Sequence, residues 1–97
     1  MQTNSLELNA VIAEVEPRRY TPAGIPALNC RLEHESQIQE AGGIRTVKMV
    51  IKAVAFGSEA ARLAQQAVGS NWNFKGFLAN ARQGKSVVFH IQDFLQN

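Results

Sequence analysis

The chain has 97 residues, of which 45% are hydrophobic and 19% are charged, and its formal net charge is +2. This size and composition are those of one soluble globular domain, so residues 1–97 are taken as a single domain. No apolar run approaches the roughly 18 residues of a membrane span, and the N-terminal segment lacks the features of a secretory signal. The one cysteine, Cys30, excludes an internal disulfide. We therefore expect a cytoplasmic protein without membrane contacts.

The first expected element is a strand over residues 6–15, where apolar side chains recur at every second position. Its opposite face begins polar and turns apolar at Val11, Ala13 and Val15. A strand that is apolar on both faces needs a second cover, which is either a helix of the same domain or a second subunit.

A proline-rich loop follows, in which Arg18, Arg19 and Tyr20 precede the sequence Thr-Pro-Ala-Gly-Ile-Pro of residues 21–26. Prolines fix φ and glycine permits a positive φ, so this loop is stiff and holds its charges in place. A second alternating strand over residues 27–36 comes next.

Residues 45–56 form a third strand, which follows a reversal at residues 40–43. Lys48 and Lys52 share one face of this strand, opposite a row of apolar side chains. Arg45 is out of phase with these lysines, so a β-bulge between Arg45 and Val47 is expected.

One helix is expected over residues 58–68, with Ser58 as its N-cap and Gly69 as its stop. Alternation then predicts strands over residues 71–77 and 86–95, joined by a polar loop. Three strands, a helix and two strands is the element order of the OB-fold, a five-stranded Greek-key barrel. The fold class is therefore all-β.

Enzyme chemistry finds little support. The sequence has no phosphate-binding glycine loop, no nucleophile elbow and no metal-ligand spacing around His34 or His90. Neighbours on a strand point to opposite faces, so at most Glu33 and Glu35 share a side, and a hydrogen-bonded His34 beneath the sheet is favoured over a metal site at these three residues. We expect no enzyme, cofactor, metal or small-molecule substrate.

Binding of a nucleic acid single strand is better supported. Residues 1–40 carry a charge of −3 and residues 41–97 a charge of +5. OB-folds bind single strands in a cationic groove across their second and third strands, flanked by the 1–2 and 4–5 loops. The side chains at these places form the candidate site: Arg18, Arg19, Tyr20, Arg31, Arg45, Lys48, Lys52, Arg82 and Lys85.

The aromatic side chains offer few platforms for bases. We expect six of them in the core, namely Phe56, Trp72, Phe74, Phe77, Phe89 and Phe94. Tyr20 alone lies on a candidate binding loop, where it either stacks on a base or packs on Pro22. A binder of this kind depends on phosphate contacts, so its affinity should be salt-sensitive and indifferent to sequence.

Several short motifs carry a family resemblance over most of the chain: TPAGIP (21–26), LEHES (32–36), QEAG (39–42), VGS (68–70) and GFL (76–78). With these motifs the chain resembles the PriB family, relatives of single-stranded DNA-binding protein that act in replication restart. The resemblance implies a homodimer that binds single-stranded DNA and contacts the PriA helicase and often DnaT. The dimer would cover Val11, Ala13 and Val15.

Carried over by position, the resemblance places Arg19, Arg82 and Lys85 in basic binding loops. Two departures lower the expected DNA affinity, because Lys48 stands where the family often has an exposed tryptophan and Glu35 stands at a basic position. Two alternatives to a DNA-binding restart protein therefore stay open. One is a protein-interaction adaptor with weak DNA binding, and the other is a general single-strand-binding protein, disfavoured because no acidic tail follows.

Overall fold

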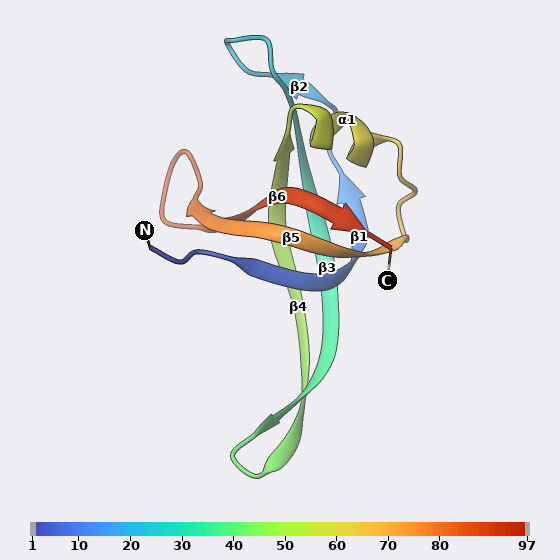
Figure 1. Ribbon diagram of the computed structural model, residues 1–97, viewed down its shortest axis with the longest axis vertical. Helices are drawn as coiled ribbons and strands as arrows, with labels where there is room; N and C mark the ends of the chain where they lie inside the picture. The colour runs from blue at the N-terminus through green and yellow to red at the C-terminus, as the bar shows by residue number, and fades with distance from the viewer. Residues whose placement is uncertain (1, 97) are drawn as a thin grey trace.

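The computed structural model describes residues 2–96 and confirms the OB-fold (Figure 1). Its elements, in chain order, are β1 (Leu6–Val15), β2 (Arg19–Tyr20), β3 (Pro26–Glu40), β4 (Gly43–Phe56), α1 (Ser58–Ala64), β5 (Asn71–Asn80) and β6 (Val87–Leu95). In the described part of the chain, no helix is long and apolar enough to cross a membrane.

Five strands close into a barrel. The sheet runs β1-β5-β6-β4-β3, and a further pairing of β1 with β3 joins its two ends. All the pairs are antiparallel except β4 with β6, which pair in parallel over residues 53–55 and 89–91. The two-residue strand β2, which the sequence did not predict, pairs only with the start of β3. This pairing closes the proline-rich loop as a short hairpin at the start of β3.

The barrel interior holds the inward row of each strand. Fully buried side chains include Leu28 and Leu32 from β3 with Phe74, Phe89 and Phe94 from the last two strands. The last three phenylalanines are in the core as predicted, and the partly buried Trp72 packs against it, edge-on to Phe94. The prediction is wrong for Phe56, which is 40% exposed, and for Phe77, which lies outside the core cluster.

Cys30 is a buried member of this core, and burial together with the Glu16 carboxylate raises the pKa of its thiol to about 12. A thiol with this pKa stays protonated near neutral pH and behaves as a small apolar side chain.

The hairpin of β3 and β4 extends far beyond the barrel and gives the molecule its 50 Å long axis (Figure 1). Its register is continuous from the pair Ala27 and Phe56 to the pair Glu40 and Gly43. The predicted bulge between Arg45 and Val47 is therefore wrong, and Arg45 projects from the face opposite to Lys48 and Lys52. We call residues 34–49 of this hairpin the arm, because their backbones pair with each other and with no other strand.

A turn of two residues closes the arm. Ala41 has φ 52° and Gly42 has φ 80°. Positive φ at both central residues is the pattern of a type I′ hairpin turn, whose twist matches that of the flanking strands. The reversal predicted at residues 40–43 is confirmed.

A bulge does occur in β1, where the pairing with β3 shifts register between Ile12 and Glu14. The extra residue, Ala13, reverses the alternation that follows it. Val15 consequently pairs with Cys30 and packs against the core. The prediction that Val15 shares the outer face with Val11 is therefore wrong.

The helix α1 ends at Ala64, four residues before the predicted end. Ser58 is its first residue and not its N-cap, which is Gly57 with φ 67°. Ile12 of β1 exchanges backbone hydrogen bonds with Gly69 and Ser70, at 2.7 and 3.0 Å. These bonds require residues 65–70 to leave the helix early and approach the sheet.

Arg62 attaches α1 to the last strand. Its Nη1 lies 3.0 Å from Glu59 and 3.0 Å from Asp93, and its guanidinium carbon lies 3.9 Å from the ring centre of Phe94. Nη2 donates to the Phe94 carbonyl. The hydrogen bond from Arg62, with a smaller contribution from the Phe94 amide, lowers the pKa of Asp93.

The lowered pKa of Asp93 gives a pH dependence of stability with a definite sign. The contribution of the ionised Asp93 carboxylate to the free energy of unfolding is fully present above the unfolded-state pKa of about 3.9. It is lost as the pH falls through the lower pKa of the folded state. Between neutral pH and about pH 3, the urea midpoint of the wild type should fall further than that of Asp93→Asn. Identical decreases in the two proteins would mean that the Arg62 contact does not couple to folding.

Gly76 is required by close approach of the backbone. A Cβ built at this position would lie 1.8 Å from the His90 carbonyl oxygen and 2.9 Å from the Phe89 ring. We expect Gly76→Ala to lower the free energy of unfolding by about 2–4 kcal/mol, measured by urea denaturation. Gly43→Ala is the matched control, because a Cβ there meets nothing within 4 Å and its φ is not positive. An equal decrease in the free energy of unfolding of the two variants would contradict the view that close backbone approach requires glycine at position 76.

Candidate nucleic-acid interface

A groove of about 390 Å³ lies between the proline-rich loop (residues 16–25, the first loop) and the β5–β6 connection (residues 81–86, the last loop). Its floor is the outer face of the barrel and includes the buried side chain of Val54. Arg19 contributes from the first loop and Arg82 from the last loop. We call this space the loop groove. The described residues that line it include two arginines and no carboxylate, so its local charge is positive.

Three rings form a column on the outer face of the barrel beside this groove. Phe77 of β5 stacks on His90 of β6 with a centroid distance of 4.8 Å and an interplanar angle of 17°. Phe56 of β4 stacks on the other side of His90 at 5.9 Å and 28°. We call this set the aromatic column. Phe56 and His90 also line the loop groove, so a flat apolar surface lies next to its two arginines.

The outer face of β3 and β4 continues from the loop groove into a second concave surface. Glu14, Glu16, Arg31 and Lys52 line it together with apolar residues of the last loop and β6. Arg31 Nη2 lies 2.6 Å from Glu14 Oε2. Two cations and two carboxylates leave no net charge on this surface. It is therefore poorly suited to bind the phosphates of a nucleic acid.

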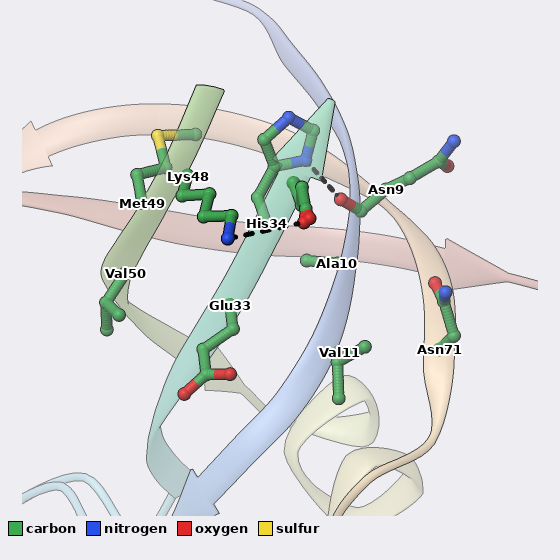
Figure 2. A pocket seen from close by; sticks show the side chains of 10 residues that line it. Asn9, Ala10, Val11, Glu33, His34, Lys48, Met49, Val50 and Asn71 are labelled. Atoms are coloured by element: carbon green, nitrogen blue, oxygen red, sulfur yellow. Dashed lines mark hydrogen bonds and ion pairs between the residues drawn. The ribbon is translucent and has the colours of Figure 1, made fainter. Parts of the chain in front are cut away.

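A third pocket, of about 630 Å³, lies where β1 and the arm diverge (Figure 2). Glu33, Glu35 and Lys48 are its charged residues, so its net charge is negative. Lys48 Nζ lies 4.0 Å from Glu35 Oε1. Figure 2 also shows the hydrogen bond between His34 and the Asn9 carbonyl, 2.5 Å long. Glu33 and Glu35 share the outer face, as predicted.

His34 is hydrogen-bonded at both ring nitrogens. Nδ1 donates to the Asn9 carbonyl, and Nε2 lies 2.8 Å from the hydroxyl of Ser36. The prediction of a hydrogen-bonded His34 is confirmed. Over residues 2–96, no group of three or more His, Cys, Asp or Glu side chains is placed so that it could hold a metal ion.

The structure divides the predicted site into two parts. Arg19 and Arg82 line the loop groove, and Arg18, Tyr20 and Lys85 lie on the same two loops, with Tyr20 61% exposed. Three other cations have a carboxylate partner on the protein: Arg31 with Glu14, Lys48 with Glu35, and Arg45 with Glu40. Lys52 lies beside Arg31 on the neutral second surface. The nine predicted residues do not form one continuous positive track.

The aromatic column was missed by the sequence analysis, although the signal was present. Strict alternation along β4 places Phe56 on the face of Lys48 and Lys52, away from the apolar row. The same rule, applied from Phe74, turns Phe77 outward. Counting each phenylalanine as a core residue by its type, without checking its phase on the strand, produced the error.

Comparison with known proteins agrees with this architecture. The sequence profile described as another single-strand binding protein family matches residues 4–93. The replication restart protein PriB of Bordetella pertussis is 46% identical over 90 residues, which cover 92% of this chain and 84% of that protein. PriB of Neisseria gonorrhoeae is 38% identical over 92 residues, covering 94% and 91%.

Solved structures give the same result. A PriB structure from Ralstonia solanacearum superposes with a TM-score of 0.90 at 40% identity, covering 98% of both chains. The single-strand-binding domain from a Synechococcus protein shares the fold, with a TM-score of 0.72 at 19% identity over 97% of this chain and 96% of that one. The fold is thus that of the single-strand-binding OB-fold proteins. Within that class, the chain belongs to the PriB family of replication restart proteins.

Proposed function

We propose that the protein binds single-stranded DNA without strong sequence specificity during replication restart in the bacterial cytoplasm. The observation that carries this proposal is the loop groove, where Arg19 and Arg82 face a space without carboxylates next to the aromatic column. Guanidinium groups bind phosphates, and aromatic faces accept any base. Both kinds of contact are sequence-tolerant.

The proposed strand path is shorter than the predicted one. Because the second surface is neutral and the pocket beside the arm is negative, the phosphates pass through the loop groove and avoid the arm. Few phosphate contacts give a modest affinity with a modest salt slope.

The test is fluorescence anisotropy with a labelled thymidine oligonucleotide of about 20 nucleotides, which exceeds the roughly 4–16 nucleotides that one OB-fold covers. We expect binding that weakens between about 50 and 200 mM salt, and much weaker binding to the matching duplex. Equal affinity for single strand and duplex would show that the surface acts only as a general positive charge.

A second role, as an adaptor for PriA and for a DnaT-type partner where one is present, is supported by the arm. Its cations lie beside carboxylates, and it exposes Ile38, Ile44 and Met49. Exposed apolar side chains with balanced charge suit a protein contact better than a polyanion. Replacing Ile38 and Ile44 by serine should reduce capture by purified PriA and leave DNA binding unchanged. Unchanged capture would remove the arm from this contact.

We also propose a homodimer that covers the outer face of β1, where Val11 and Ala13 are half-buried in the single chain. Val15 no longer belongs to this interface, because it packs inward. Light scattering after size exclusion should give twice the chain mass of 10.7 kDa at micromolar concentration. Val11→Arg should yield the monomer, and a monomeric wild type would refute the dimer.

A further inference from the structure

The aromatic column has a histidine at its centre, and this is the one ring of the three that can carry a charge. His90 stacks on Phe77 at 4.8 Å and on Phe56 at 5.9 Å. The same side chain lines the loop groove, which Arg19 and Arg82 also line. We propose that His90 is the third DNA-binding cation of this groove, and that binding of single-stranded DNA therefore takes up a proton. This inference rests on the proposed binding of single-stranded DNA.

The edge of the His90 ring is accessible, although its faces are covered. Phe56 and Phe77, from the strands on either side, stack on the ring. Among residues 2–96, the two ring nitrogens have no hydrogen-bond partner, and no side-chain nitrogen that lacks a partner is buried. The nitrogens consequently reach solvent, where the ring can take up a proton.

The two phenylalanine rings suit the charged form of this imidazole. Histidine is the side chain whose charge ordinarily changes between about pH 5 and 8. A cation within about 6 Å of the centre of an aromatic ring is attracted by the negative face of that ring. Both centroid distances of His90 lie within this limit. The aromatic column can therefore hold a positive charge without a carboxylate in contact with it.

The two arginines of the groove determine the sign of the coupling. Arg19 and Arg82 line the same space as His90, so an imidazolium is repelled by both of them in the free protein. Phosphates that occupy the groove neutralise the arginines and attract the imidazolium. This argument requires only that the charges lie close together, well within the screening length of about 10 Å, and does not depend on which ring nitrogen meets a phosphate. The protonated protein should bind DNA more tightly, so DNA binding takes up a proton by linkage.

The remaining neighbours of His90 change little when DNA binds. Glu59 of α1 shares a pocket of about 350 Å³ with His90, which neither arginine of the loop groove lines. Glu59 Oε2 lies 3.0 Å from Arg62 Nη1, which balances its charge. The strands beside β6 place apolar side chains, Val54 and Phe77, opposite His90. The coupling is therefore assigned to the loop groove.

The experiment is a titration of the labelled thymidine oligonucleotide by anisotropy at about pH 5.5 and about pH 7.5, at constant ionic strength. Thymine has no group that titrates between these values. We expect the wild type to bind about three- to tenfold more tightly at the lower pH. Its salt slope should be steeper there by about 0.7, the value for one more cation on a single strand.

The chain contains two histidines, so the pH dependence can be assigned by substitution. His90→Gln is uncharged at both pH values and should lose the difference. His90→Arg carries a permanent charge that stacks on the same rings, so it should bind tightly at both pH values. His34→Gln is the matched control, because His34 is hydrogen-bonded at both ring nitrogens and lies in the pocket beside the arm. It should keep the wild-type difference.

The outcomes separate this inference from the function on which it rests. Equal affinity of the wild type at the two pH values would overturn the proton uptake and leave the binding function standing. A difference that persists in His90→Gln would overturn the role of His90. Should the urea midpoint show that this variant does not fold, pH-dependent binding by His90→Arg would overturn that role equally. Absence of binding by the wild type at both pH values would overturn the proposed function itself.

Discussion

Removal of Arg19 and Arg82 together should weaken binding to single-stranded DNA by about ten- to a hundredfold at low salt, with a salt slope reduced by about 2. The two side chains face the loop groove, and none of the carboxylates in the described part of the chain lines it. We therefore expect each of the two arginines to contact one phosphate. Anisotropy titrations of Arg19→Ala/Arg82→Ala against salt concentration measure both quantities.

The matched control is Arg45→Ala/Lys48→Ala, which also removes two positive charges, but from the arm. Arg45 lies 2.8 Å from Glu40, and Lys48 lies 4.0 Å from Glu35. Exposed ion pairs of this kind stabilise little, but the neighbouring carboxylate cancels the local potential that a phosphate would meet. We expect less than about a threefold change for this variant. Equal losses in the two double mutants would mean that net charge alone governs binding.

Phe56→Leu should weaken binding by about tenfold while leaving the salt slope unchanged, because stacking on one aromatic ring is worth about 1–3 kcal/mol per base. Leucine keeps the apolar bulk and removes the π face. Since Phe56 is 40% exposed and outside the core cluster, the urea midpoint should change little. The salt series therefore separates this effect from the loss of a phosphate contact.

Phe56→Trp is the rescue variant, because it restores a flat ring of larger area at the same position. We expect its affinity to equal or exceed that of the wild type, with fluorescence quenching when DNA is added. If the leucine variant bound as tightly as the wild type, Phe56 would be only a cover for His90, on which it stacks at 5.9 Å.

These two predictions place the DNA contacts elsewhere than the family resemblance implies. That resemblance implies that Lys48 stands where relatives often have an exposed tryptophan, and Lys48 lies on the arm with Glu35 Oε1 4.0 Å from its Nζ. Phe56, eight residues later on the same strand and the same face, offers a ring nearer to the two loops. The loss of one platform on the arm therefore does not leave the protein without an aromatic surface.

The sequence by itself determined the fold, because alternation, turn residues and element order act locally. The apolar rows of β1 and β3, the reversal before Gly43, and the basic residues of both loops could all be assigned from spacing alone. The motifs of the PriB family were equally local. Each of these features depends on neighbours within a few positions.

Only the tertiary structure decided which of these residues act together, because that depends on pairing between distant strands. The bulge at Ala13 turned Val15 into the core, and the unbroken register of the arm turned Arg45 away from Lys48. The carboxylate of Glu14 lies beside Arg31 although seventeen residues separate them. Charge along the chain showed how many cations were available, whereas the packing of strands determined that Arg19 and Arg82 meet across one groove.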